Sequence, residues 1–410
     1  MGRNQESLTP ADEMKVLLAH NFYRSGSPSG EDAVYRSERN LLETTADVIS
    51  YERHNDDIDV STITDKLRLV VETGWSRKVY EELSTIIRKA QPDIAHFHNT
   101  FPQISPSAYA ACRDNNVPVV QTLHNFRFIC PGGLLLRDGR PCEDCIGTNL
   151  FPALRYRCYR NSLPETAAVV WMLAKNRWDR TYQTLVNRYI ALTEFASSRL
   201  IAGGLPRERI VVKPNFVADI PMPGDGKGGY AVYVGRLSVE KGLRTVMSAW
   251  KHLPEVPLKI LGEGPLRQEL EQAIARDNLP VDYLGFCDRT TIVDLVGRAA
   301  FQIVPSEWYE GFPMVIVDAF ACGTPVVSSR IGSLDEIVEE GITGMKFEPR
   351  NPVDLANKVR ALWADPARQI SLRSTTREIF DTHFSGVKNH EALMKIYEAA
   401  INDHLGTIRE

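Results

Sequence analysis

Short runs of apolar, β-branched residues alternate along the chain with longer segments whose apolar residues recur at helical spacing. A first series of such runs predicts strands at residues 15–19, 48–51, 94–97, 117–121, 189–192 and 210–212. A second series predicts strands at residues 230–234, 258–261, 281–284, 301–304 and 326–328. Segments with helical periodicity, such as 77–90, 243–251 and 265–276, lie between them. The alternation predicts an α/β protein with two doubly wound parallel-sheet (Rossmann-like) domains.

A segment rich in proline and glycine separates the two series. We expect an N-terminal domain at 14–214, a linker at 215–229, a C-terminal domain at 230–385, and a last helix at 386–410. That helix is predicted to cross back to the first domain. Open α/β sheets bind ligands beyond the carboxyl ends of their strands, so we expect the site in a cleft between the two domains.

Composition and charge narrow the class of protein. The chain is 43% hydrophobic and 24% charged, which excludes a disordered or fibrous protein. With 48 basic and 52 acidic residues, a net charge of -4 offers no general attraction to nucleic acid or to anionic membranes. The polar first residues lack a signal peptide's apolar core, and no apolar run approaches the roughly 20 residues that span a bilayer. We therefore expect a cytoplasmic protein with no nucleic-acid partner.

The most informative segment follows the predicted strand at 301–304 and reads PSEWYEGFPMVIVDAFACGTPVVSSRIGSLDEIV. Gly311 permits a close backbone approach, and Pro313 is expected to be the first residue of a helix over 314–322. The free N–H groups of such a helix start favour an anion or a polar ligand. Glu310 and Asp318 then form an acidic pair that could hold two hydroxyl-bearing groups. The alternative is that Glu310 caps the helix and Asp318 is solvated.

Two other loops begin where strands are predicted to end. VGRLSVEK, at 234–241, places Arg236 and Lys241 at a helix entrance, and two cations there suit a diphosphate. A pair of exposed surface cations is the alternative interpretation. LGEGP, at 261–265, lacks the last glycine of the dinucleotide fingerprint GxGxxG.

Together these segments resemble the family-4 retaining glycosyltransferases, which have the two-domain GT-B fold. The resemblance is carried by VGRLSVEKG, by LGEGP and by PSEWYEGFPMVIVDAFACGTPVV, which looks like the family's E-x7-E motif, and it extends from about residue 14 to the end. It implies an acceptor-side N-terminal domain and a C-terminal domain that binds a nucleotide-diphosphate sugar.

The resemblance also implies roles for individual residues. Glu310 would hold hydroxyls of the donor sugar, while Arg236 and Lys241 would neutralise its diphosphate. Asp318 stands where the family has a ribose-binding glutamate, which is one methylene longer. Further residues implied in donor binding are Gly235, Gly264, Gly311, Phe312, Pro313 and Met314.

The first half adds weaker, compatible signals. Residues 24–32 (RSGSPSGED) resemble the family's donor-side loop, in which Gly30 would approach the diphosphate; the alternative is a surface loop. His98 and His124 each follow a predicted strand, and QTLHNFR resembles the family's sugar-binding histidine segment. We expect His124 to act in catalysis with Glu310, and both histidines to contact sugar, although a lone histidine is often structural.

The implied activity is retaining transfer of a sugar to a glycan or a lipid-linked acceptor, in bacterial surface polysaccharide or glycoconjugate synthesis. Front-face displacement needs no metal, because the cationic pair stabilises the departing diphosphate. The alternatives are a nucleotide-sugar-binding protein with a degenerate site, marked by Asp318, or a nucleotide-sugar epimerase.

Four clustered cysteines suggest a metal. Cys130, Cys142, Cys145 and Cys158 have the spacing C-x11-C-x2-C-x12-C, which is compatible with a structural four-thiolate zinc site. The insertion at about 130–158 would fold around it. Reduced thiols, or a disulfide formed on oxidation, are the alternatives.

A basic, aromatic stretch follows at 151–188. It holds seven basic and two acidic residues, hence 7 − 2 = +5, in a chain whose net charge is -4. Such a surface suits anionic lipid headgroups or a lipid-diphosphate acceptor, which predicts peripheral contact with the inner face of the cell membrane. The alternative is a core helix with a solvated basic face.

Overall fold

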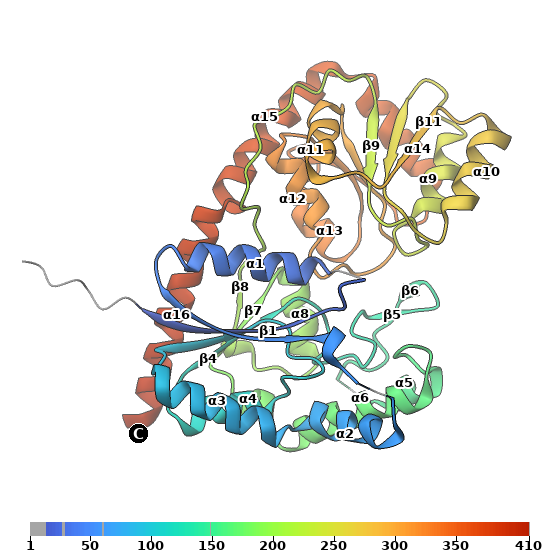
Figure 1. Cartoon of the computed structure of the whole chain (residues 1–410). Coiled ribbons are helices and arrows are strands. Elements are labelled where there is room, and N and C mark those ends of the chain that lie inside the picture. Colours follow the sequence, from blue (N-terminus) through green and yellow to red (C-terminus); the bar gives the residue numbers. More distant parts are fainter. Residues whose placement is uncertain (1–13, 27–28, 60, 148, 410) are drawn as a thin grey trace, which may run out of the picture.

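Two six-stranded sheets form the two halves of the molecule (Figure 1). The structure is a computed structural model that describes residues 14–26, 29–59, 61–147 and 149–409. The strand order is β2-β1-β3-β4-β7-β8 in the first sheet and β11-β10-β9-β12-β13-β14 in the second, and neighbouring strands are parallel throughout. The predicted pair of doubly wound α/β domains is confirmed.

The strands of the first sheet are β1 (Lys15–Phe22), β2 (Asp47–His54), β3 (Ile94–Phe97), β4 (Val119–Leu123), β7 (Arg188–Ala191) and β8 (Ile210–Val212). The helices of this half are α1 (Gly30–Leu42), α2 (Ile63–Gly74), α3 (Arg77–Ala90), α4 (Ser107–Asp114), α5 (Phe151–Tyr156), α6 (Leu163–Trp178), α7 (Thr181–Thr184) and α8 (Glu194–Ala202). A small hairpin, β5 (Leu136–Arg137) with β6 (Arg140–Pro141), projects from it.

The strands of the second sheet are β9 (Ala231–Val234), β10 (Leu258–Leu261), β11 (Val281–Gly285), β12 (Gln302–Val304), β13 (Val326–Ser329) and β14 (Gly344–Phe347). Its helices are α9 (Leu243–Trp250), α10 (Arg267–Asp277), α11 (Arg289–Arg298), α12 (Met314–Ala321), α13 (Gly332–Ile337), α14 (Pro352–Trp363) and α15 (Pro366–His383). The last helix, α16 (Gly386–Arg409), leaves this half.

Several strands differ from the prediction: β1 and β2 are longer, β7 is shifted by one residue, and the hairpin of β5 and β6 was not predicted. Two further differences have a local physical cause. β4 begins two residues later than expected, because the Val117 amide donates to Cys112 O and so still belongs to the turn that ends α4. β14 was missed, since it is short and begins with a glycine instead of a β-branched run. An ideal Cβ on Gly344 would lie 1.8 Å from Val326 O, so the close approach of β14 to β13 requires a glycine there.

The predicted loop at 24–32 is partly helical. Ser29 caps α1 by accepting from the Glu31 amide, and Asp32 bonds back to the Ser29 amide, so 30–32 form the first helical turn. Ser27 and Pro28 of that stretch lie outside the described residues. The prediction of a loop for 30–32 was therefore wrong.

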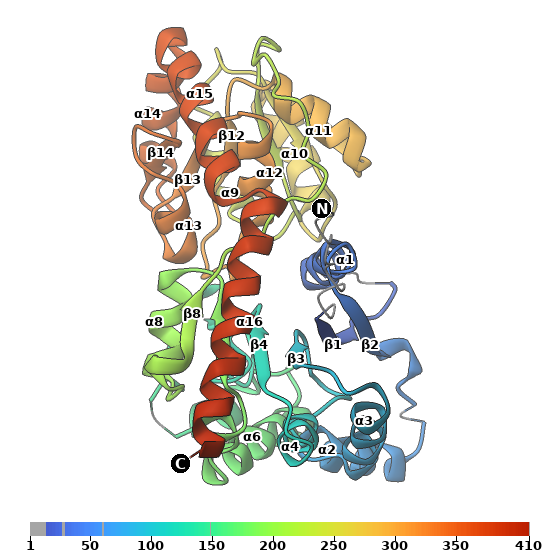
Figure 2. The ribbon, with the colours of Figure 1, turned by 90° about the vertical axis from the view of Figure 1, so that its left-hand side faces the viewer.

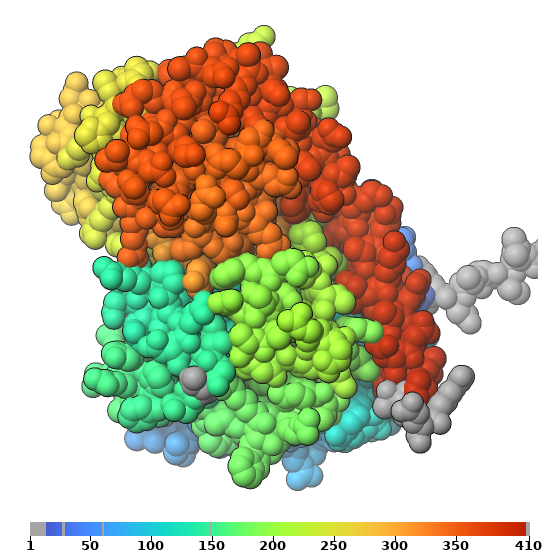
Figure 3. Space-filling view, turned by 180° about the vertical axis from the view of Figure 1, so that it is seen from behind, coloured from blue at the N-terminus to red at the C-terminus, as the bar shows by residue number. Residues whose placement is uncertain are grey.

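The chain crosses between the halves twice, and the crossing segments pair with each other. The Val217 amide donates to Phe384 O at 3.2 Å, and α16 then runs across the first sheet (Figure 2). Leu393, Tyr397 and Ala400 of α16 are fully buried in the cluster that β1, β3 and β4 help to form. From the opposite side, α15 and α16 run along one flank of the molecule, from the second half onto the first (Figure 3).

Candidate active site

Glu310 lies in the loop between β12 and α12 and is ion-paired. One carboxylate oxygen accepts a hydrogen bond from Ser306 Oγ, and the other lies 2.8 Å from Lys241 Nζ. The residue is 7% exposed. A carboxylate this buried needs a compensating charge, which Lys241 supplies. The structure thus brings together two of the predicted catalytic residues.

Close backbone packing determines where Lys241 stands. Gly242 has φ 73°, and an ideal Cβ on it would lie 1.9 Å from Pro305 O. The turn after Lys241 therefore rests directly on the chain leaving β12, a position that only glycine permits. This contact places the ammonium group beside Glu310, and also 5.7 Å from the centroid of the Trp308 ring.

The glycine-containing loops that follow β9 and β10 pack directly against each other. An ideal Cβ on Gly262 would lie 2.0 Å from Gly235 O, and one on Gly264 would lie 2.4 Å from Leu237 O. Gly264 and Gly235 thus serve the packing of these loops, while the Arg236 side chain between them is exposed. Tyr233 OH donates to Arg236 O at 2.9 Å, and both burial and the nearby Glu310 raise the pKa of Tyr233. The Arg236 backbone therefore borders the Glu310 region.

Asp318 is separate from Glu310 and has its own partner. Arg289 Nη2 donates to Asp318 Oδ1 at 3.0 Å. Burial raises the pKa of Asp318, and the Arg289 guanidinium opposes that shift. Both carboxylates of the predicted acidic pair are thus ion-paired, which differs from the alternative of a solvated Asp318.

The start of α12 differs by one residue from the prediction. The helix begins at Met314, so Pro313 is its N-cap and the expectation of Pro313 as the first helical residue was wrong. Phe312 and Met314 are half-buried and pack against the cluster beneath α12. Phe312 also lies 6.3 Å from Phe384, ring centroid to ring centroid, near the second chain crossing.

The loops after β4 and β12 meet between the two halves. An ideal Cβ on Gly311 would lie 2.3 Å from His124 O, so the backbones of Gly311 and His124 touch. We call this meeting of residues 124–125 with 310–311 the junction. Thr193 Oγ1 and Ser333 Oγ, 3.0 Å apart, link α8 to α13 beside it. His124 from the first half therefore faces the loop that carries Glu310.

His98 and His124 are bonded to each other. His98 Nδ1 lies 2.9 Å from His124 Nε2, and the two rings are stacked. Burial, followed by the neighbouring His98, lowers the pKa of His124 well below its ordinary value. His124 is therefore a neutral imidazole at pH 7, suited to hydrogen bonding with hydroxyl groups.

The buried histidines predict that acid destabilises the fold. Burial lowers the pKa of His20 to about 4 and that of His96 well below 6.5, as it does for His124. Below pH 6.5 the unfolded chain gains protons that the folded chain does not, so the free energy of unfolding falls as pH falls. Each histidine contributes a slope of at most about 1.4 kcal/mol per pH unit.

Urea unfolding midpoints between pH 7.5 and 5.0 test this expectation. His20→Gln should flatten the slope, and His252→Asn, at an exposed position, should leave it unchanged. Equal stability of the natural chain at pH 6.5 and 5.0 would contradict the prediction.

Sequence reasoning missed a polar group beside His124. Asn125 Nδ2 donates to Glu31 Oε1 at 2.8 Å, and Tyr23 OH donates to Glu31 Oε2 at 3.2 Å. Burial raises the pKa of Glu31, while these two bonds oppose it. Gly30, the predicted diphosphate contact, is the residue before Glu31 and opens α1. The acidic residue beside Gly30 was the sequence feature that could have indicated this polar group.

The four predicted metal-binding cysteines line one small cavity. It has a volume of about 20 Å³ and is bordered by Cys130, Cys142, Cys145 and Cys158, together with Arg137 and Asp144. Burial, and then the neighbouring Cys130, raises the pKa of Cys145 to about 11. Among the described residues, no three of these sulfur atoms lie within 4.8 Å of one another, so binding zinc would require the side chains to turn toward the cavity centre.

Some side chains of the basic stretch at 151–188 are buried in the core, and others are exposed on the surface. Val169, Met172 and Leu173 of α6 are buried, whereas Trp171 and Trp178 are 41% and 88% exposed. Four of its seven cations have partners within the protein. Arg177 donates to Ile129 O at 3.2 Å, Arg188 pairs with Asp403, and Lys175 and Arg160 pair with Asp179 and Glu165, the two acidic residues of the stretch. The side chains of Arg155, Arg157, Arg160 and Arg180 are exposed.

The apolar part of this surface lies on α2, which was not among the predicted helices. Ile63, Leu67 and Val71 follow one another at helical spacing on α2 and are 77%, 61% and 59% exposed. α2 lies against α6, since an ideal Cβ on Gly74 would meet the Trp171 ring at 2.2 Å. None of the helices in the described ranges combines the length and the apolar character needed to cross a bilayer.

Two parallel α/β sheets that meet at the junction, with basic and acidic side chains at their strand ends, form the two-domain GT-B fold. Family models agree: residues 51–219 match "Glycosyltransferase Family 4" and residues 223–379 match "Glycosyl transferases group 1". An uncharacterized glycosyltransferase of Methanocaldococcus jannaschii is 30% identical over 75% of this chain and 77% of its own length. The chain belongs to the family-4 glycosyltransferases.

Other relatives and one solved structure extend the comparison. D-inositol 3-phosphate glycosyltransferase 1 of Catenulispora acidiphila is 29% identical over 82% of this chain and 79% of its own. The chain spans about half the length of several other curated relatives that it matches, including 45% of the glycogen synthase of Mycobacterium tuberculosis. The crystal structure of HepE of Anabaena, in complex with UDP, has a TM-score of 0.66 and 20% identity over 94% of this chain and all of its own, which shows a shared fold.

Proposed function

We propose that the chain is a retaining glycosyltransferase that moves a hexose from a nucleotide-diphosphate sugar to a glycan or a lipid-linked acceptor. The ion pair between Lys241 and Glu310 at the start of α12 carries the proposal, because it joins a phosphate-binding cation to a hydroxyl-binding carboxylate. A departing diphosphate would attract Lys241 together with Arg236. Glu310 would then be free to accept hydrogen bonds from the sugar.

The proposed chemistry is front-face displacement without a metal. The bond between the anomeric carbon and the phosphate oxygen breaks while the bond to the acceptor oxygen forms on the same face. The proton of the acceptor hydroxyl passes to the departing phosphate oxygen, so atoms and charge balance. Arg236 and Lys241 stabilise the negative charge that develops on the leaving group. His124 and Glu310 position the sugar.

A panel of UDP-, GDP- and ADP-sugars, each assayed with and without EDTA, tests the proposal. Release of one nucleotide that persists in EDTA is the expected result, and anomer analysis of the transferred sugar tests retention. We would begin with UDP-sugars, since HepE, which shares the fold, was crystallised with UDP. If calorimetry detected nucleotide binding but no donor sugar was turned over in the presence of an acceptor extract, the alternative of a degenerate binding protein would be favoured. We place the reaction in the cytoplasm, in surface polysaccharide or glycoconjugate synthesis.

We also propose that the cysteine cavity holds one structural zinc ion. Four thiols around a cavity of about 20 Å³ match the ligand number of a closed structural site. We expect about one zinc per chain by elemental analysis, and a lower melting temperature after Cys142→Ser or Cys145→Ser. Cys287→Ser, outside the cavity, is the matched control and should retain the metal. Purified protein without zinc would contradict the proposal.

The surface formed by α2 and α6 is proposed to contact anionic membrane. Its exposed apolar residues, Ile63, Leu67, Val71 and Trp178, lie on two helices that pack against each other, and the segment 151–188 also carries exposed arginines, a combination that suits an interfacial surface. The triple variant Ile63→Ser, Leu67→Ser, Val71→Ser should lower the fraction that sediments with phosphatidylglycerol vesicles at least several-fold. Ile370→Ser, at a 70% exposed position on α15, should not. Unchanged sedimentation of the triple variant would count against this surface.

A further inference from the structure

A buried polar network lies behind the histidine pair of the junction. Glu38 of α1 is 1% exposed, and one of its carboxylate oxygens lies 2.9 Å from Lys213 Nζ, just after β8. The other oxygen lies 3.0 Å from His98 Nε2. Asn389 of α16 accepts a second hydrogen bond from Lys213 at 2.9 Å. Elements far apart in the sequence thus meet at one carboxylate.

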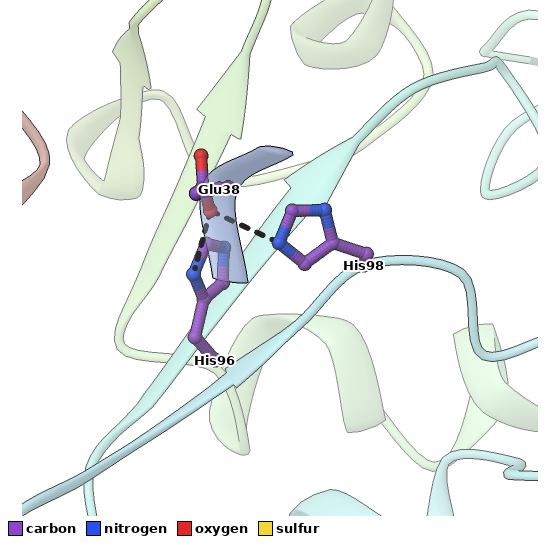
Figure 4. A group of neighbouring side chains, drawn as sticks. All are labelled: Glu38, His96 and His98. Carbon is purple, nitrogen blue, oxygen red and sulfur yellow. Dashed lines mark hydrogen bonds and ion pairs between the residues drawn. The ribbon is translucent and has the colours of Figure 1, made fainter. Parts of the chain in front are cut away.

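The same carboxylate has the appearance of a metal site (Figure 4). Among the described residues, Glu38, His96 and His98 are the one set of three side chains whose possible ligand atoms lie within 4.8 Å of one another. Lys213 argues against a cation there, because its ammonium group already neutralises Glu38. His96 is also engaged elsewhere, 2.8 Å from the Tyr397 hydroxyl and 2.8 Å from Thr122 Oγ1. The arrangement is better explained as a hydrogen-bond network.

The network determines which ring nitrogens carry protons. Although burial acts to raise the pKa of Glu38, the Lys213 ammonium group holds it well below its ordinary value, so the carboxylate is ionised. An ionised carboxylate only accepts hydrogen bonds, and therefore His98 Nε2 carries a proton and donates it. Lys213 already balances the charge of Glu38, so a neutral His98 completes the network without an uncompensated charge in the interior.

The proton position on His98 determines the proton position on His124. Since the Nδ1 atom of a neutral His98 is an acceptor, His124 Nε2 must carry the proton in the 2.9 Å bond between them. His124 Nδ1 is then the unprotonated nitrogen. Within the described ranges no residue bonds to that atom, and His124 is 9% exposed to solvent. A hydroxyl group at the junction could donate to it.

We propose that Glu38, paired with Lys213, is a positioning residue that acts through His98 to present His124 Nδ1 as a hydrogen-bond acceptor for a sugar hydroxyl. The inference rests on the proposed function for the identity of the ligand, although the protonation pattern itself does not. Asn389 accepts from Lys213 and so connects this network to α16. The last helix thereby helps to hold Lys213 beside Glu38.

The first test reads the histidine proton directly. In the full chain with ¹⁵N-labelled histidine, long-range ¹H–¹⁵N spectra at pH 8 should show His124 protonated at Nε2 and bare at Nδ1. The His124→Gln spectrum assigns the signals. A proton on Nδ1 would overturn the proposal. This measurement needs no substrate, so its outcome is independent of whether the chain transfers sugar.

The second test uses the double variant Glu38→Gln, Lys213→Met, which removes both buried charges together and leaves neither unpaired. The neutral amide can present either its oxygen or its NH2 group to His98, so both tautomers of His124 should appear. We expect kcat to fall about 10-fold or more, while nucleotide affinity stays within about threefold. Retention of a single tautomer, or an unchanged kcat in an active enzyme, would overturn the proposal.

Tyr397→Phe is the matched control. It removes a buried hydrogen bond at His96, whose Nδ1 also lies 3.3 Å from Glu38, but leaves in place the bonds that join Glu38 to His98 and His98 to His124. A lower melting temperature with unchanged His124 tautomer and kcat is expected. If Tyr397→Phe shifted both as strongly as the double variant, the effect would be general loss of packing and the proposal would be overturned.

Discussion

Glu310→Gln should lower turnover by roughly 100- to 1000-fold and leave nucleotide binding intact. The carboxylate would stabilise the positive charge that develops on the sugar ring as the diphosphate leaves, and a neutral amide cannot. The substitution also releases Lys241 from its 2.8 Å ion pair with Glu310. UDP should therefore bind at least as tightly as to the natural chain. Steady-state nucleotide release and calorimetry measure the two effects.

Glu307→Gln is the matched control for that variant. Glu307 lies in the same loop and is equally buried, but its carboxylate accepts from Thr245 Oγ1 at 2.6 Å and pairs with Arg350 at 2.9 Å. Its loss should reduce stability and change turnover by less than about tenfold. Turnover of Glu310→Gln equal to that of the natural chain would remove Glu310 from the proposed mechanism.

The double variant Arg236→Met, Lys241→Met should lose both nucleotide affinity and turnover. A charge-assisted hydrogen bond to phosphate contributes about 1.5–3 kcal/mol, so each substitution should weaken UDP binding about 10-fold or more. Turnover should fall by roughly a further 100-fold, because charge on the leaving diphosphate grows in the transition state. Calorimetry with UDP and release assays in EDTA distinguish the two losses.

Arg244→Met is the control for this pair of cations. Arg244 follows Lys241 by one turn, but its guanidinium pairs with Glu269 at 2.9 Å on the surface. We expect unchanged affinity and turnover for this variant. Equal nucleotide affinity of the natural chain and the double variant would show that Arg236 and Lys241 do not bind the diphosphate.

Local patterns were sufficient for much of the fold. Strands buried on both faces, such as β3 and β4, appear in the sequence as short apolar runs, and turn residues separate them from the helices. The elements that escaped prediction lack such a pattern. β14 begins with a glycine required by its neighbour, and the first turn of α1 contains polar residues that look like a loop until Ser29 is seen to cap it.

The candidate site also has parts that the sequence predicted and parts that it did not. Glu310, Arg236 and Lys241 could be found from the sequence, because strand ends, glycines and charged residues occur at recognisable spacing. The ion pair between Glu310 and Lys241 could not be predicted from the sequence, and neither could the ion pair between Asp318 and Arg289. Each of these contacts joins side chains from different elements, and no local periodicity specifies which elements become neighbours.

The sequence by itself determined the class of this protein: two parallel α/β sheets, a donor-site motif at the strand ends of the second, and two histidines at those of the first. Only the tertiary structure decided which groups are bonded. Glu38 and Lys213 lie 175 positions apart, yet they form one buried ion pair that sets the protons of His98 and His124. Burial makes such a pairing consequential, because an ionised group in the interior must be compensated by whichever partner the fold brings within reach.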